Sequence, residues 1–162
     1  MSKSHFATAG ALVLALVIVS GAAQAASPLS PLAGTWSGGG TLSTSDGMQE
    51  RLRCRATYDV DGSGSEVSLN LRCASASYNF DLSGNAAYRG GAISGQWSES
   101  TRNASGTISG RASGDHIEAA ARGNNFSASL SLTTRGNRQM VSIRPQAANV
   151  TAVSLSLSRT GR

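Results

Sequence analysis

The residues of this chain that could do chemistry are few and scattered. Residues 59–64 read D-x-D-x-S-G, which is how a calcium-binding loop begins. The twelfth position of such a loop is a bidentate Glu and here it is Asn70, so we interpret the stretch as a hairpin turn. His116 follows Gly and Asp in another turn-forming tripeptide, and no serine has a nucleophile-elbow context. We therefore expect no metal site, no cofactor and no enzymatic activity.

Arginines form a second feature with chemical potential. Four of them share the outward face of two alternating runs, because side chains two residues apart in a strand point the same way. They are Arg51, Arg53, Arg55 and Arg72. Such a face could bind an anionic surface, such as lipid phosphates or polyanionic envelope sugars. The alternative is a solvated face balanced by nearby carboxylates. Basic patches with stacking aromatic residues are missing from the sequence, which argues against a nucleic-acid partner.

The only two cysteines lie in the same two runs, residues 51–60 and 66–74. Apolar and polar residues alternate strictly there, which predicts two strands with one buried face each. An Asp-Gly-Ser-Gly turn joins them in a register that places Cys54 opposite Cys73 and every apolar residue opposite another. We predict a disulfide between Cys54 and Cys73, worth about 3 kcal/mol for a loop of about twenty residues. Two free buried thiols are the alternative.

The same alternation recurs to the end of the chain. One expected hairpin places Trp97 over Gly106 and Ile93 over Gly110, an arrangement typical of a strongly curved sheet. Short sequential strands joined by turns favour a meander, and closing it removes the exposed edges. The sequence therefore predicts an all-β protein, an up-and-down antiparallel β-barrel of about 8–10 strands. A β-sandwich is the alternative.

The first 25 residues have the form of a secretory signal peptide. A short basic start is followed by the apolar run of residues 9–21 and by Ala-Gln-Ala at positions 23–25. Residues 26–33 would then be an extended leader, and residues 34–162 a single β-barrel domain. We expect a periplasmic or extracellular protein with no membrane span in the mature chain. The formal net charge of +5 is mildly basic.

The tripeptide Gly34-Thr35-Trp36 opens the first expected strand. It resembles the Gly-x-Trp motif of lipocalin-like and avidin-like barrels, and this resemblance implies that Gly34 and Trp36 close one barrel end. The chain also resembles periplasmic inhibitors of secreted metalloproteases, which are small barrels with one disulfide. That resemblance implies that residues 26–33 enter a protease cleft. As a whole the chain is similar to an uncharacterised family of small exported bacterial β-barrel proteins, which implies no activity.

Many inward residues of the expected barrel are alanine or glycine, and such small side chains could leave a cavity. We therefore expect the barrel to bind a small apolar or amphipathic ligand. The expected lining residues are Tyr58, Leu69, Tyr78, Phe80, Trp97 and Phe126. A tightly filled barrel is the alternative interpretation of the small residues. The alternative functions are a protein-interaction module, such as a periplasmic protease inhibitor, or an envelope structural protein that uses the arginine face.

Overall fold

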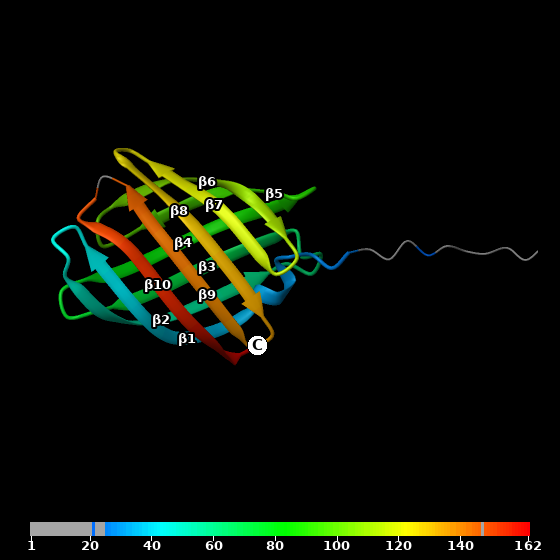
Figure 1. The fold of residues 1–162 in the computed structure, drawn as a ribbon. Coiled ribbons are helices and arrows are strands. Elements are labelled where there is room, and N and C mark those ends of the chain that lie inside the picture. The colour runs from blue at the N-terminus through cyan, green and yellow to red at the C-terminus, as the bar shows by residue number, and fades with distance from the viewer. Residues whose placement is uncertain (1–20, 22–24, 147) are drawn as a thin grey trace, which may run out of the picture.

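The alternating runs form ten β-strands in the computed structural model, which describes residues 21, 25–146 and 148–162 (Figure 1). The strands are β1 (Gly34–Thr44), β2 (Gln49–Val60), β3 (Glu66–Ala74), β4 (Asn79–Arg89), β5 (Ala92–Glu99), β6 (Ala104–Ser113), β7 (His116–Gly123), β8 (Phe126–Arg135), β9 (Arg138–Gln146) and β10 (Val150–Gly161). Almost all of the predicted signal peptide, residues 1–20 and 22–24, lies outside the described residues.

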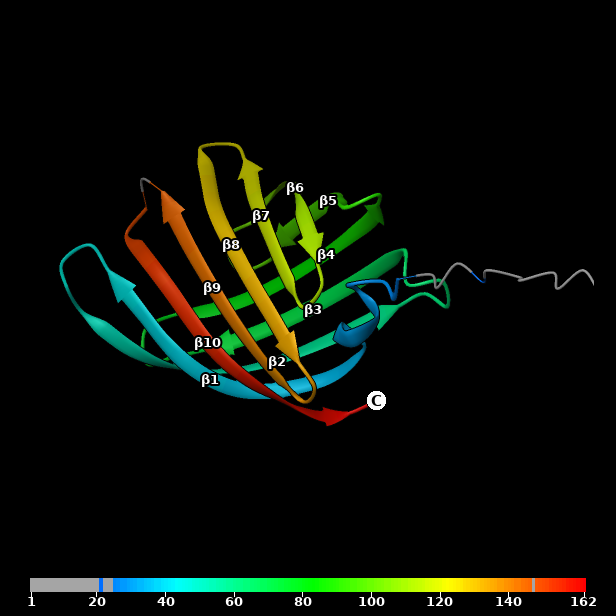
Figure 2. The same cartoon turned by 45° about the vertical axis from the view of Figure 1, so that its right-hand side comes forward.

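Each strand pairs antiparallel with the next one in the chain, and β10 pairs with β1, so the sheet closes on itself (Figures 1 and 2). The predicted up-and-down barrel is confirmed. The sandwich alternative is wrong, because the pairing of β1 with β10 leaves no open sheet edge. No helix among the described residues is long and apolar enough to cross a membrane.

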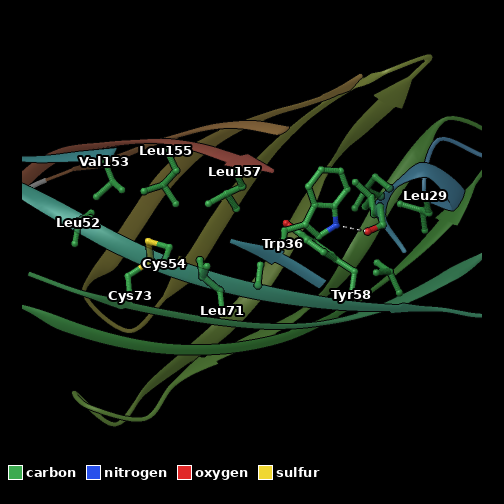
Figure 3. Close-up of a cluster of buried hydrophobic side chains, with 14 of the residues drawn as sticks. Leu29, Trp36, Leu52, Cys54, Tyr58, Leu71, Cys73, Val153, Leu155 and Leu157 are labelled. Carbon is green, nitrogen blue, oxygen red and sulfur yellow. Dashed lines mark hydrogen bonds between the residues drawn. A yellow bond between two sulfur atoms is a disulfide. The ribbon is translucent and has the colours of Figure 1, made fainter. Parts of the chain in front are cut away.

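The predicted register of the first hairpin is confirmed. Cys54 on β2 lies opposite Cys73 on β3, and a disulfide joins them with their Cα atoms 4.1 Å apart. Both cysteines are buried on the inward face of the barrel, where Figure 3 shows the bridge near Leu52 and Leu155. The alternation of side chains set this register, because any slip by one residue would turn the apolar face of one strand outward.

Inward glycines allow the curvature of the second predicted hairpin. Trp97 on β5 lies opposite Gly106 on β6, as the sequence predicts. A Cβ atom on Gly106 would overlap the carbonyl oxygen of Arg122 on β7. The backbones of β6 and β7 therefore lie too close together for a side chain at Gly106. The indole of Trp97, opposite Gly106 on β5, fills the space that a side chain there would occupy.

Residues 28–33, the segment before β1, fill one end of the barrel; we call this segment the plug and this end the plugged end. The 3₁₀-helix η1 (Ser30–Leu32) lies there, as Figure 2 shows, and its buried Leu32 and the preceding Leu29 belong to the main hydrophobic cluster. Trp36 is fully buried, and its indole N–H donates a 2.8 Å hydrogen bond to the carbonyl oxygen of Leu32 (Figure 3). The Arg159 guanidinium stacks over this indole, 4.2 Å from its centroid, and donates to the carbonyl oxygens of Pro31 and Ala33.

The prediction of an extended leader over residues 26–33 is therefore wrong. Leu29 and Leu32 are three residues apart, so a turn followed by a 3₁₀-helix brings both side chains to one face, whereas an extended chain would turn them to opposite faces. The folded form buries both leucines almost completely. Gly34 and Trp36 do lie at this plugged end, and the plug itself is made by the segment that precedes them.

Candidate ligand-binding site

A cavity of about 330 Å³ occupies the interior of the barrel away from η1. Nine strands, β2 to β10, contribute inward side chains to its wall, and most of these side chains are apolar. Ala121 and Ala128 are buried residues of this wall, so their small side chains help to leave the space open. The mouth includes Tyr78, Arg102 and Asn149, which lie in or beside the turns at the end of the barrel opposite η1.

Four of the six predicted lining residues border this cavity, and they form two aromatic pairs. Tyr78 and Phe80 stack with their ring centroids 6.4 Å apart and their planes almost parallel. Trp97 and Phe126 meet edge to face at 5.3 Å. Such pairs add attraction beyond the area that they bury. The aromatic residues therefore pack against each other in the cavity wall, on or beside β4, β5 and β8.

Tyr58 and Leu69 were also predicted to line a ligand site, and the structure does not place them in this cavity. Both face inward, but they pair with each other near the β2–β3 turn, at the plugged end. Tyr58 is buried and donates a hydrogen bond to Gln139, and the half-buried Leu69 packs against the main hydrophobic cluster. Alternation determines which face a side chain occupies, whereas its position along the barrel axis depends on the stagger of the strands.

The wall contains a buried polar group without a partner. Among the described residues, the indole N–H of Trp97 is the one buried side-chain donor that makes no hydrogen bond. Trp97 itself is 7% exposed. An unpaired buried donor costs about 1–3 kcal/mol, so this position differs from Trp36, whose N–H is bonded to Leu32.

A carboxylate that sequence analysis missed lies at the mouth. Glu99, 8% exposed, accepts hydrogen bonds from the backbone N–H groups of Asp81, Thr101 and Arg102 and from the Thr101 hydroxyl. Burial raises the pKa of its carboxyl, but these hydrogen bonds outweigh burial and hold the pKa below the usual range. The sequence signal was available, because Glu99 has the same parity as the inward residues Ile93 and Trp97.

Arg102 is held beside this carboxylate. Its guanidinium lies over the ring of Phe80, 4.8 Å from the centroid, and Nη1 is 3.7 Å from Oε2 of Glu99. The same Nη1 donates hydrogen bonds of 3.1 Å to the Asn79 carbonyl oxygen and 3.0 Å to the Thr101 hydroxyl. Sequence analysis missed Arg102 because it lies in a turn outside the alternating runs. The antiparallel pairing of β4 with β5 sets Leu82 opposite Glu99, and this register places the turn after β5 beside Phe80.

The predicted arginine face is on the outside of the barrel. Arg51, Arg53, Arg55 and Arg72 are all exposed. Arg55 and Arg72 lie opposite each other on β2 and β3, as predicted, and Asp81 on β4 forms a 3.3 Å ion pair with Arg72. The repulsion between the two facing arginines is therefore partly balanced by a carboxylate on the next strand.

The remaining candidates from the sequence have local roles. The Asp61 carboxylate accepts hydrogen bonds from the backbone N–H groups of Ser63 and Glu66, an arrangement that stabilises the β2–β3 turn. His116 begins β7 and contacts Thr133 and Glu118 through its two ring nitrogens. No group of three or more His, Cys, Asp and Glu side chains within the described part of the chain is arranged to hold a metal ion.

Comparison with known proteins identifies the fold. No protein-family model matches the sequence, and no curated protein matches it. The structure is similar to that of Rv2717c from M. tuberculosis, with a TM-score of 0.64 and 13% identity over 82% of this chain and 94% of that chain. It is also similar to the S-type phycobiliprotein lyase CPES from Guillardia theta, with a TM-score of 0.61 and 9% identity over 82% of this chain and 90% of that chain. Likeness at these identities shows a shared barrel fold.

Proposed function

We propose that this protein is an exported, non-enzymatic barrel that binds a small apolar or amphipathic ligand. The observation that carries the proposal is the apolar cavity of about 330 Å³ with a polar mouth at one end of the barrel. Cavities of ligand sites are typically about 300–1,000 Å³ and combine an apolar wall with a few polar groups. A cavity with so few polar partners holds water poorly, so an apolar group is its natural occupant.

The plugged end adds a further argument. With Leu29, Leu32 and Trp36 filling that end, a ligand would enter and leave through the mouth around Tyr78 and Arg102.

Export is supported by two independent features of the chain. Residues 1–25 have the order of basic, apolar and small-residue segments that signal peptides share. The chain also uses both of its cysteines in one disulfide, a bond that persists in oxidising compartments such as the periplasm.

A pair of alanines on one strand tests whether the cavity is the binding site. Ala121 lines the cavity, whereas its neighbour Ala120 faces outward on β7. In calorimetric titrations with 1-decanol, we expect wild type and Ala120→Leu to bind equally and Ala121→Leu to bind at least about tenfold more weakly, because added methyl groups occupy the cavity. Thermal melts establish that both variants are folded. Absence of binding to wild type, or equal binding to both variants, would overturn the proposal.

A further inference from the structure

We propose that the ligand is an anionic amphiphile, with a carboxylate-type head group held by Arg102 at the mouth and an unbranched apolar tail inside the barrel. This inference rests on the proposed function and adds a chemical class to it. Arg102 is the one cation among the described residues that line the cavity. The other charged lining residue is Glu99, so the choice of head group depends on which of these two charges remains available.

Glu99 is the group that is already occupied. Its two carboxylate oxygens accept four hydrogen bonds from residues 81, 101 and 102, and its side chain is only 10% exposed. The separation of 3.7 Å between Arg102 Nη1 and Glu99 Oε2 is longer than a hydrogen bond. The two groups form an ion pair without a hydrogen bond, so Glu99 stabilises the turn that presents Arg102 and leaves the Nε and Nη2 donors for another acceptor.

Arg102 has donors to spare. A guanidinium carries five N–H groups, and both hydrogen bonds that this side chain donates to described residues come from Nη1. The side chain is 47% exposed, so a head group can reach it from solvent. The guanidinium makes a cation–π contact with the ring of Phe80, and this ring also forms part of the cavity wall. A planar anion bound to Arg102 is therefore continuous with the apolar space.

Tyr78 provides a second donor at the same mouth. Its phenol oxygen accepts a 2.8 Å hydrogen bond from the Asn149 amide, and Asn149 in turn accepts one from the Ser45 hydroxyl. These bonds orient the phenol through its oxygen, and its hydroxyl proton is donated to none of the described residues. The mouth thus offers a cation and a hydroxyl donor, which together suit a carboxylate or a phosphate monoester.

The size of the cavity limits the tail. A space of about 330 Å³ has room for about ten groups of the size of a water molecule or a methylene. Decanoate and 1-decanol are therefore matched probes, because they share a tail of this length and differ in the charge of the head group.

The experiment compares these two probes by calorimetry on the full mature chain. We expect wild type to bind decanoate about tenfold or more tightly than 1-decanol, since a charge-assisted hydrogen bond contributes at least that factor. Arg102→Gln removes the charge and most of the preference, and it leaves the affinity for 1-decanol within about twofold. Arg102→Lys retains part of the preference, because lysine keeps the charge without the planar fork. Arg89→Gln, an exposed arginine beside the β4–β5 turn at the plugged end, is the matched control and leaves both affinities unchanged.

The outcomes separate this inference from the proposed function. Equal binding of both probes to wild type and to Arg102→Gln would overturn the anionic head group and leave the ligand-binding barrel standing. Failure of both probes to bind wild type would overturn the proposed function and this inference with it. A thermal melt of Arg102→Gln shows whether a lost affinity reflects unfolding, and the retained affinity for 1-decanol provides the same check at the site.

Discussion

The phenol of Tyr58 on β2 donates a 2.9 Å hydrogen bond to Oε1 of Gln139 on β9, and it does so through the barrel interior, because these strands do not pair with each other. Gln139 is fully buried, and its side-chain amide donates a 3.2 Å hydrogen bond to the Thr134 hydroxyl. Burial raises the pKa of Tyr58 well above its ordinary value, although the bond to Gln139 opposes that shift. The phenol therefore stays neutral and acts as a fixed cross-link beside the plug.

Removing this phenol hydroxyl should destabilise the fold. Tyr58→Phe leaves the buried amide oxygen of Gln139 without a donor, which costs about 1–3 kcal/mol of unfolding free energy in urea titrations. Tyr88→Phe, at a half-buried tyrosine whose hydroxyl makes no hydrogen bond to described residues, is the control and should cost less. Adding Gln139→Leu to Tyr58→Phe should recover part of the loss, because it removes the orphaned acceptor. A loss confined to the control would contradict the cross-link.

The disulfide should raise the free energy of unfolding. The double variant Cys54→Ala/Cys73→Ala opens a loop with a sequence separation of 19 and should lower the unfolding free energy by about 2–4 kcal/mol. Wild type melted in reductant should lose a similar amount, and the double variant should not respond to reductant. An unchanged melting temperature after complete reduction would show that the disulfide does not contribute to stability.

The plugged end should depend on Trp36. Trp36→Ala removes a fully buried indole and should cost about 3–5 kcal/mol, and it should expose residues 27–33 to limited proteolysis because the hydrogen bond to Leu32 is lost. Met140→Ala, at an outward side chain that is 67% exposed, is the control and should be nearly neutral. A cost below about 1 kcal/mol at Trp36 would mean that the indole does not hold the plug.

Acid should weaken the mouth through Glu99. Its pKa is lower in the folded chain than in the unfolded chain, so its contribution to stability is complete above the ordinary pKa of about 4.3 and is lost as the pH falls through the folded pKa. Glu99→Gln should therefore be less stable than wild type at neutral pH, with a gap that narrows in acid. Urea titrations from about pH 7 to about pH 3 measure this gap. A Glu99→Gln gap that does not change with pH would refute the assignment.

The curvature at β5 to β7 should not tolerate a side chain at Gly106. Gly106→Ala places a Cβ against the Arg122 carbonyl oxygen and should cost more than about 1 kcal/mol, because the overlap is with backbone. Gly62→Ala, in the β2–β3 turn with open space around it, should be neutral or slightly stabilising. Equal effects of the two substitutions on thermal melts would show that the strands can separate at no cost.

The interior ligand site was only partly predictable from the sequence. Tyr78, Phe80, Trp97 and Phe126 were identified because they lie on the inward parity of their strands. Tyr58 satisfies the same rule and lies at the plugged end instead, bonded to Gln139. Parity is a local property of the extended backbone, and it carries no information on the depth of a side chain within a closed barrel.

What the sequence determined by itself is the pairing of the strands: the Cys54–Cys73 bridge, the position of Trp97 over Gly106 and the closure of an all-β meander. The two pairings follow from alternation, because a slip of one residue would expose an entire apolar face. Closure follows because it removes the exposed edges of a meander. Only the tertiary structure decided that residues 28–33 fold into the barrel end and that Arg102, from a turn, lies over Phe80. Neither contact follows from the alternation within a strand. Leu29 and Leu32 pack inside the barrel end, and Arg102 reaches Phe80 from a turn beside the β4–β5 pair, so both contacts depend on how the elements lie in space.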